Sequence, residues 1–499
     1  MRRRPNFKIY LLLGTIMADN AISKKRTKIV ATIGPASWDE DKIRRMIAAG
    51  MNVARINFSH GNHEQHERSI DTIRRIAEQE NAVIAILCDL QGPKIRIGTI
   101  KNPIDLADGE KITLTLDKAD GTNNTITAPH PEFFKEIRPK THILLDDGNL
   151  ELKVIEKTPR ALICTVVQGG ILNSNKGLMA VNVDISLPAI TAKDHTDIEF
   201  ALSQKTDYLA LSFVRSADDV CELRQIMDNL QGNAAIVAKI ERHEALADIR
   251  NIIAASDAIM VARGDLGLDT PPEEVPFHQK RIIQLCNDAG KPVITATQML
   301  DSMVASPRPT RAEASDVYNA IIDGTDAVML SNESAIGDFP VESVQTMTNI
   351  ALSAEQHIQY YNIDKRKTTT HEDSEPIADA ISKATYHIAE TLNPRVIVTA
   401  SLTGYTTRQV SRERPHVPIL CITSNKTTYR RMALVWGVLP LIIPDFDTFN
   451  EMVEIITAIT IEELIVDYGD TIIIVAGVPF HIGGKTNLLK IHKIEKKIL

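Results

Sequence analysis

Residues 235–265 read AIVAKIERHEALADIRNIIAASDAIMVARGD, and this stretch decides the fold. Its first apolar run ends with Lys239 and Glu241 two residues apart, so on a strand both side chains leave the same face at the carboxyl end. The next run, 257–261, leads into a glycine-flanked turn that carries a second carboxylate, Asp265. Two carboxylates beside a lysine suit a divalent cation that holds a phosphorylated or carboxylated substrate. The alternative is a buried ion pair and an ordinary strand-to-helix turn, which the second carboxylate disfavours.

Length and composition limit the class of protein. A chain of 499 residues is too long for one ordinary core and predicts two to four domains. The net charge of −8 and a pI of about 6.0 argue against a nucleic-acid or membrane-surface binder. The five cysteines have no pairing or metal-ligand spacing, which is typical of reduced core thiols and predicts a cytoplasmic location.

The first residues have the pattern of a leader. Residues 1–26 begin with a basic segment and then an apolar one, as a short signal peptide does, and Met17 opens a more ordinary start. We expect residues 1–16 to be a non-native upstream start, because nothing else in the chain looks secreted. No apolar run has the length of a transmembrane helix.

Short β-branched runs alternate with longer amphipathic stretches, which indicates βαβ units and a parallel sheet. Eight such runs make a (β/α)8 TIM barrel the natural closure, formed by 27–92 together with 187–355. The eight predicted strands are 27–34, 51–58, 83–90, 207–213, 234–241, 257–261, 292–297 and 326–331.

Three further segments have their own patterns. Residues 93–186 alternate over short spans with Gly, Asp and Asn turns, which predicts a small inserted β-barrel domain, placed to act as a lid over the barrel mouth. Residues 356–375 are polar without apolar period and predict a linker. Residues 376–499 return to an α/β pattern, with strands at 394–400, 418–423 and 471–477, and predict a C-terminal regulatory domain.

Polar side chains gather where the barrel strands end, and catalytic groups of this fold lie at those carboxyl ends. Taken alone, each of these side chains could have a purely structural role, such as a hydrogen bond to the backbone of a turn or the capping of a helix. Jointly, they predict a mouth lined by cations and carboxylates. Beyond the opening stretch, the polar residues at or just after these ends are Arg55, Asn57, Ser59, Asp89, Lys94, Arg96, Thr297 and Glu333.

These motifs together resemble the pyruvate kinase family, from about Lys28 to the C-terminus and through both added domains. The resemblance implies phosphoryl transfer from phosphoenolpyruvate to ADP, giving pyruvate and ATP in the last step of glycolysis. It also implies a need for Mg2+, with Mn2+ as a substitute. The motifs are KIVATIGPAS, GMNVARINFSHG, DLQGPKIRIG, AKIERHEAL, MVARGDLG, KPVITATQML, SPRPTRAEASDV and SNESAIGDFP.

The resemblance assigns roles to the mouth residues. Glu241 and Asp265 match the ligands of the divalent ion, and Lys239 matches the lysine that stabilises the transferring phosphoryl group. Fixed positive charge is what that reaction needs, because negative charge spreads over the phosphoryl oxygens. Arg55 matches a residue that contacts the phosphate. Thr297 matches a residue near the enolate carbon, and it either donates a proton to that carbon itself or orders the water that does.

Further matches concern the substrate carboxylate, the nucleotide and an effector. The turn at Gly264 and Asp265 resembles a backbone cradle for the substrate carboxylate. The nucleotide contacts would be Asn57, His60, Arg96 and, on the lid, Lys176. A phosphorylated effector would bind at Ser401, Thr403, Gly404 and Thr406, with 483–486 closing the site. A solvated Ser/Thr turn is the alternative reading of that loop.

One departure concerns K+. Members that require K+ carry Glu where this chain has Lys94, and the Lys94 ammonium would bring the positive charge covalently and repel K+ at short range. Leu90, Gln91 and Ile97 also match K+-independent members. The alternative is that Lys94 points into solvent. K+ is therefore expected not to be required, although the chain keeps the family's monovalent-cation positions Asn57, Ser59, Asp89 and Leu90.

Two rival functions stay open on the residues alone. One is another phosphoenolpyruvate or pyruvate barrel, such as an aldolase or mutase, which the inserted lid and the C-terminal domain disfavour. The other is a catalytically inactive sugar-phosphate sensor, which the intact Lys239, Glu241, Asp265 and Thr297 disfavour. The resemblance also implies a homotetramer, and the net charge argues against a nucleic-acid or membrane partner.

Overall fold

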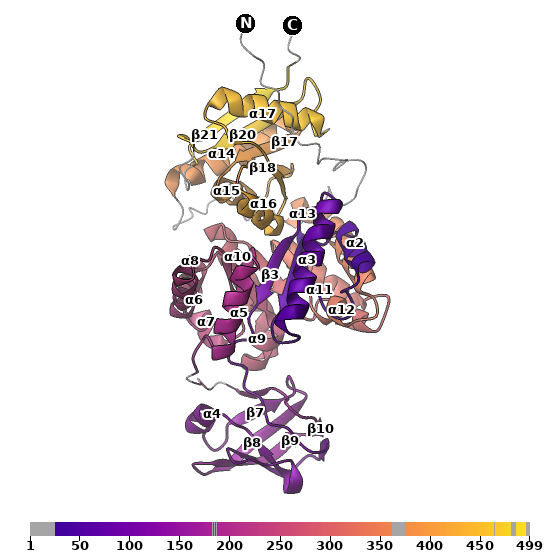
Figure 1. Cartoon of the computed structure of the whole chain (residues 1–499), viewed down its shortest axis with the longest axis vertical. Coiled ribbons are helices and arrows are strands. Elements are labelled where there is room, and N and C mark those ends of the chain that lie inside the picture. Colours follow the sequence, from indigo (N-terminus) through magenta and orange to yellow (C-terminus); the bar gives the residue numbers. More distant parts are fainter. Residues whose placement is uncertain are drawn as a thin grey trace.

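A computed structural model of the chain describes residues 25–361, 375–480 and 486–495, except 182, 184, 186 and 464. Figure 1 shows three bodies along the long axis, with the barrel between the inserted lid and the C-terminal domain. Most of the predicted leader and linker lies outside the described residues.

The central body is a closed barrel of eight parallel strands, which confirms the predicted fold. The strands are buried along nearly their whole length and read as apolar runs, as expected where helices cover a parallel sheet. Asn57 pairs with Asp89 where two neighbouring strands end, so polar side chains meet at one edge. The barrel strands are β1 (Lys28–Thr32), β2 (Val53–Asn57), β3 (Ala85–Asp89), β12 (Tyr208–Leu211), β13 (Ala235–Ile240), β14 (Ala258–Ala262), β15 (Val293–Ala296) and β16 (Ala327–Leu330).

Amphipathic helices surround the barrel, and several begin at side-chain caps such as Asp39 and Asn62. The last one, α13, continues to Tyr361, so the linker predicted from 356 begins inside this helix. The longer helices are α2 (Glu40–Ala48), α3 (His63–Gln79), α5 (Ala192–Ser203), α6 (Ala217–Asn229), α10 (Val275–Ala289), α11 (Arg311–Ile322) and α13 (Pro340–Tyr361). The shorter ones are α7 (His243–Ala247), α8 (Ile249–Ala255), α9 (Arg263–Asp269) and α12 (Asn332–Ala335).

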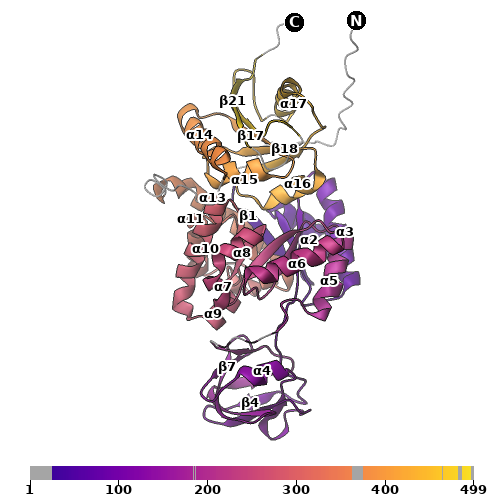
Figure 2. The same ribbon diagram turned by 90° about the vertical axis from the view of Figure 1, so that its left-hand side faces the viewer.

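The lid is a curled six-stranded sheet and a two-stranded ribbon around a separate apolar core (Figure 2). Its strands run from Ile104 to Ala180, inside the predicted range 93–186. All pairs in it are antiparallel except β5 with β6, which run parallel. The strands are β4 (Ile104–Leu106), β5 (Lys111–Thr115), β6 (Thr125–Thr127), β7 (His142–Leu145), β8 (Leu150–Lys157), β9 (Ala161–Gln168), β10 (Gly170–Leu172) and β11 (Leu178–Ala180), with helix α4 (Pro131–Glu136).

The C-terminal domain is a five-stranded sheet in the order β19-β18-β17-β20-β21, with β21 antiparallel. Its three predicted strands are present, and two further strands were missed. Pro440 interrupts the pattern of β19, and β21 carries three basic residues among its apolar ones. The elements are α14 (Pro376–Leu392), β17 (Val396–Ala400), α15 (Tyr405–Arg412), β18 (Ile419–Thr423), α16 (Lys426–Arg431), β19 (Val438–Ile442), α17 (Phe449–Glu462), β20 (Thr471–Ala476) and β21 (Leu488–Lys493).

The amino end of the barrel contacts the C-terminal domain. Lys28 Nζ donates to the carbonyl oxygen of Val438 at 2.7 Å, and Arg430 pairs with the buried Asp207. The packed chain starts earlier than the predicted domain limit at residue 27, because Lys25 is buried and donates to Asn52 Oδ1 at 2.8 Å. Among the described residues, no helix has the length and apolar character needed to span a bilayer.

Candidate active site

Lys239 is the centre of the mouth formed by the carboxyl ends of the barrel strands. Its Nζ lies 3.0 Å from Glu241 Oε1 and 3.1 Å from Asp89 Oδ1. It also donates to Ser212 Oγ at 2.7 Å. Burial alone would lower the pKa of this ammonium, but Asp89 and Glu241 outweigh burial and raise the pKa above its ordinary value. Lys239 is therefore a fixed, buried positive charge.

The Asp89 carboxylate, at the end of β3, pairs with two positively charged side chains. Its Oδ2 accepts from Arg55 Nε at 2.7 Å, and its Oδ1 faces Lys239. Burial would raise the pKa of this carboxyl, but Lys239 and Arg55 lower it below its ordinary value. Arg55 also donates through Nη1 to Thr32 Oγ1 at 2.9 Å, at the end of β1. Both cations are thus oriented before any ligand arrives.

Glu241 and Asp265 fit a divalent cation. Glu241 is buried, and its Oε2 accepts from the backbone N–H of Phe213 at 2.7 Å. The pKa of the Glu241 carboxyl is raised above its ordinary value. Burial is the main cause, Lys239 opposes it, and the nearby charge of Asp265 adds to it. A bound divalent cation would relieve the cost of holding these two carboxylates together in a poorly solvated place.

Thr297 has a strained backbone beside the turn at Gly264. Its φ is +72°, a region that β-branched residues avoid, and Gln298 follows at +53°. Thr297 Oγ1 accepts from the Gly264 N–H at 2.7 Å and donates to the carbonyl of Ala296. Arg263 Nη2 donates to the Thr297 carbonyl at 2.9 Å. The N–H that the resemblance assigns to a carboxylate cradle thus lies against the Thr297 hydroxyl.

The residues predicted to contact the nucleotide lie on two bodies. Burial lowers the pKa of His60 on the barrel, and the positive charges of Arg96 and Arg55 lower it further. On the lid, Arg96 Nη1 donates to the carbonyl of Asn175, and Lys176 Nζ lies 2.7 Å from Asp146. The two lid cations are therefore held by lid atoms.

Two atoms at the predicted monovalent-cation positions accept hydrogen bonds from the protein itself. Asn57 Oδ1 accepts from the Ser59 N–H at 3.1 Å, and the Leu90 carbonyl accepts from Ser212 Oγ at 2.7 Å. Lys94 Nζ lies 3.4 Å from Asp147 Oδ1 on the lid, and the Lys94 side chain is 28% exposed.

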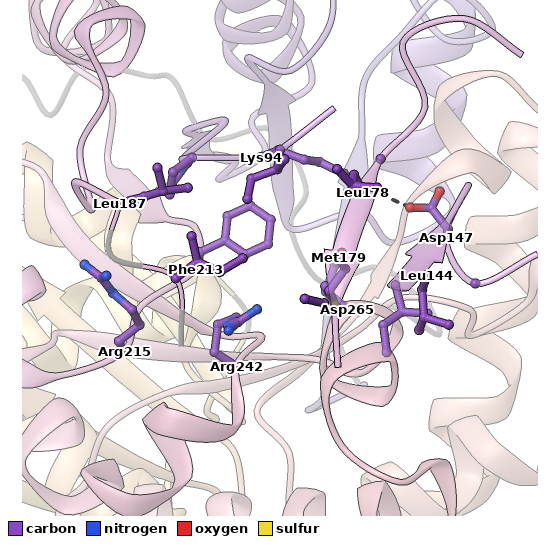
Figure 3. A pocket seen from close by; sticks show the side chains of 17 residues that line it. Lys94, Leu144, Asp147, Leu178, Met179, Leu187, Phe213, Arg215, Arg242 and Asp265 are labelled. Atoms are coloured by element: carbon purple, nitrogen blue, oxygen red, sulfur yellow. Dashed lines mark hydrogen bonds and ion pairs between the residues drawn. The ribbon is translucent and has the colours of Figure 1, made fainter. Parts of the chain in front are cut away.

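An apolar pocket separates the lid from the barrel beside this ion pair. Figure 3 shows Lys94 reaching toward Asp147 on one side, with Phe213 below it. The pocket encloses about 740 Å³, including space open to solvent, and reaches Asp265. The pocket between the lid and the barrel thus lies next to a predicted metal ligand.

A larger cavity runs across the barrel mouth and is lined by six of the predicted site residues: Arg55, Asn57, His60, Gly264, Asp265 and Thr297. Lys239, Glu241 and Asp89 do not line this cavity, but Asp89 pairs both with Arg55, which does, and with Lys239. The lining residues that matter here are Thr32, Pro35, Trp38, Arg55, Asn57, His60, Lys94, Arg263, Gly264, Asp265, Thr297, Asn332 and Ile336.

Two residues of the site were missed from the sequence. Ser212 directly follows β12 and accepts a hydrogen bond from Lys239, and the strand-end rule that selected Asp89 would also have selected it. Arg263 follows β14 and holds both the Thr297 carbonyl and Asp316, at 2.7 Å from the latter. Its partners are distant in sequence, so no local pattern indicates that role.

The predicted effector loop lies in the C-terminal domain, between β17 and α15. Gly404 has φ +77° and precedes α15, and Thr406 is buried with its Oγ1 2.8 Å from Thr486 Oγ1. Ser401 and Thr403 are at least partly accessible. Residues 483–485 lie outside the described residues.

One other group in the described residues could hold a metal: His243, Glu244 and Asp269. Arg242 lies 3.1 Å from Glu244 and 3.4 Å from Asp269, so a guanidinium already balances these carboxylates. This cluster is an ion-pair network.

Together, the closed barrel and its mouth define a lidded (β/α)8 enzyme. The mouth presents a buried ammonium, an oriented arginine and a carboxylate pair suited to a divalent cation, as phosphoryl transfer requires. Comparison with known proteins gives the same class. Residues 24–344 match the family profile "Pyruvate kinase, barrel domain", and residues 379–492 match "Pyruvate kinase, alpha/beta domain".

Individual relatives agree. The chain is 46% identical to the pyruvate kinase of Geobacillus stearothermophilus over 475 residues, covering 94% of this chain and 81% of that one. It is 44% identical to those of Sporosarcina psychrophila (94% and 80%) and Staphylococcus aureus strain USA300 (95% and 81%). The chain belongs to the pyruvate kinase family, and it is an enzyme of the transferase class.

Proposed function

We propose that the chain transfers the phosphoryl group of phosphoenolpyruvate to ADP, giving pyruvate and ATP in the last step of glycolysis, with Mg2+ or Mn2+. The observation that carries the proposal is the buried Lys239 ammonium, fixed between Asp89, Glu241 and Ser212 at the barrel mouth. Such a preorganised charge does not have to reorient during the reaction, which makes it effective in stabilising a transferring phosphoryl group.

The other residues of the mouth have separate roles in binding the substrate and the divalent ion. Arg55 contacts the phosphate of the substrate, and its guanidinium is oriented by Asp89 and Thr32. Glu241 and Asp265 would hold the divalent ion, which when bound withdraws charge from substrate oxygens. The Lys239 ammonium then stabilises the negative charge of the phosphoryl group while that group moves to the nucleotide.

After transfer, the enolate carbon needs a proton. Thr297 is the nearest hydroxyl to the Gly264 turn, and it either donates that proton or orders the water that does. A threonine hydroxyl is a weak acid, so the strained backbone and the Arg263 contact act by fixing its position. The substrate carboxylate would accept from the backbone N–H groups of Asp265 and Gly264 at the start of α9, where it would replace Thr297 Oγ1 as the acceptor for Gly264.

The nucleotide would bind toward Asn57, His60, Arg96 and Lys176. Because the last two belong to the lid and face lid carbonyl or carboxylate groups, they reach the nucleotide only when the lid moves. No dependence on K+ is expected: Asp89 is balanced by Arg55 and Lys239, and Lys94 adds a further charge at the mouth.

A phosphorylated effector is proposed at Ser401, Thr403, Gly404 and Thr406, where a turn opens α15 of the C-terminal domain. A homotetramer and a cytoplasmic location complete the proposal. The location is supported by the free cysteines, of which Cys88, Cys164, Cys286 and Cys421 are buried thiols without disulfides.

A coupled assay tests the function. Pyruvate formation is followed from phosphoenolpyruvate and ADP, with Mg2+ and with a chelator. Pyruvate that needs both ADP and Mg2+ supports the proposal. Turnover of phosphoenolpyruvate without ADP would favour a rival barrel chemistry, and binding of sugar phosphates without turnover would favour an inactive sensor.

A further inference from the structure

Two large apolar side chains stand exposed on the wall of the mouth cavity. Trp38, in the loop after β1, is 43% exposed, and Ile336, just after α12, is 59% exposed. Both line the same cavity as Arg55 and His60. Apolar surface displayed inside a binding cavity indicates a ligand that covers it, since exposure to water is unfavourable.

A backbone hydrogen bond joins the two segments that carry these side chains. The Ala36 N–H donates to the carbonyl of Ala335 at 2.9 Å, which ties the loop of Trp38 to the end of α12. The approach is close enough to require glycine, because a Cβ on Gly34 would lie 2.6 Å from that carbonyl oxygen. The Ile336 N–H donates to Asn332 at 3.0 Å. The rim is therefore built before a ligand binds.

The cavity changes from charged to apolar along one short segment. Arg55 contacts Thr32, the last residue of β1, and the chain then runs directly through Pro35 to Trp38. On the facing side, Ala335 and Ile336 follow the end of β16. A ligand along this path would meet a guanidinium at the strand ends and an apolar surface at the rim. A nucleoside diphosphate has this distribution, with anionic phosphates at one end and a flat ring at the other.

We propose that Trp38 and Ile336 form the site that holds the nucleobase of the nucleoside diphosphate, with the indole face stacked on the ring. This inference rests on the proposed function and adds the rule by which the nucleotide is chosen. An indole face contacts the π-face that every base has and reads no hydrogen-bonding edge. The enzyme therefore accepts ADP and GDP alike and uses the smaller ring of UDP less well.

The chain supplies its own optical reporter for this site. It contains two tryptophans, and the other one, Trp436, is buried at 2% exposure beside Arg414 in the C-terminal domain. ADP and GDP should quench tryptophan emission in a saturable manner, UDP should quench it less, and tripolyphosphate should not. In Trp38→Phe the quenching should disappear. Equal quenching by tripolyphosphate, or full quenching in Trp38→Phe, would overturn the inference.

Kinetics give an independent readout. Loss of a base–aromatic stack of ordinary strength should raise the KM for ADP about tenfold in Trp38→Ala, while kcat and the KM for phosphoenolpyruvate stay near wild type. Ile336→Ala should act in the same direction by a smaller factor. The matched control is Tyr468→Ala, which removes an exposed aromatic (57%) from the C-terminal domain and should change neither constant.

The outcomes separate this inference from the proposed function. Wild-type enzyme that makes no pyruvate from phosphoenolpyruvate and ADP refutes the function. Wild-type enzyme that is active, with an unchanged KM for ADP in both Trp38→Ala and Ile336→Ala, refutes only the base site. An equal loss of kcat for every nucleotide would also contradict stacking, because stacking acts on binding.

Discussion

At the scale of single residues, the site is a set of charges that hold one another in place. Asp89 pairs with Arg55 and Lys239, and Lys239 pairs in turn with Glu241. Each charge is buried, so removing one leaves its partner without compensation in a poorly solvated place. Substitutions here should therefore change activity far more than substitutions of surface charges.

The division of roles predicts a split phenotype for Lys239→Met. Phosphoryl transfer should fall at least about a thousandfold, because the ammonium acts on the phosphoryl group. Proton exchange at the methyl group of pyruvate should remain largely intact, since enolisation relies on the ion held by Glu241 and Asp265. Both rates are measured on one preparation, with Lys280→Met, a lysine 58% exposed on α10, as the control. Near-normal kinase turnover in Lys239→Met would refute this role.

We expect Lys94 to decide whether the enzyme needs K+. With tetramethylammonium as the only monovalent cation, the wild-type enzyme should be fully active, and added K+ should change its rate little. Lys94→Glu should create a dependence on K+, because a glutamate removes a fixed positive charge and supplies a negative one beside Asp147. Lys94→Gln is the matched control and removes only the charge. Strong activation of the wild type by K+ would contradict the expectation.

At the scale of elements, the eight barrel strands followed from their apolar periodicity, because a parallel sheet buries both faces of each strand. Strand ends then supplied most of the mouth. Strands β19 and β21 were missed, since Pro440 and the lysines of β21 break the pattern that defined the others. The end of the barrel was placed too early because the last turns of α13 read as polar linker.

Contacts between distant segments explain the rest. The strain at Thr297 depends on Arg263 and Gly264, more than thirty residues earlier in the chain, and no local sequence signal records it. The presence of Trp38 and Ile336 in the wall of one cavity likewise depends on contacts between distant segments, such as the hydrogen bond between Ala36 and Ala335. The sequence alone predicts which residue types gather at the mouth, whereas the structure is needed to show which atoms are in contact.

The loop before α15 leads us to predict that a phosphorylated effector regulates the enzyme. A phosphorylated sugar or a nucleoside monophosphate should lower the phosphoenolpyruvate concentration that gives half-maximal rate. Thr403→Glu should abolish that response without changing the unregulated rate, because a carboxylate repels the anion. Thr403→Val is the matched neutral variant. If none of these compounds shifts the half-saturation in the wild type, the effector site is disproved.

At the scale of the whole molecule, the barrel and the C-terminal domain share buried charges. Burial lowers the pKa of Lys28 to about 8 from 10.5, partly offset by Glu355 and Asp326, while its Nζ donates to Val438. Arg414 bridges to Asp326 at 3.0 Å, and Arg430 to Asp207 at 2.7 Å. The two bodies are thus joined by groups whose burial carries a cost.

The lowered pKa of Lys28 predicts a pH-dependent effect on stability. Between about pH 8 and pH 10 the unfolded chain binds more protons at this lysine than the folded one, so its burial penalty fades as the pH rises. The Tm of Lys28→Met minus that of wild type should therefore be largest near pH 7 and fall toward pH 10. Thermal unfolding across this range measures it, with Lys280→Met as control. A difference that grows with pH would show that the sign is wrong.

The most direct test of the account follows the phosphorus atom. Phosphorus NMR of wild-type enzyme with phosphoenolpyruvate, ADP and Mg2+ should show the phosphoenolpyruvate resonance decreasing as the γ-phosphate resonance of ATP increases by an equal amount. Chelation of Mg2+ should stop both changes. Release of the phosphoryl group as inorganic phosphate, or an unchanged phosphoenolpyruvate resonance, would contradict the account.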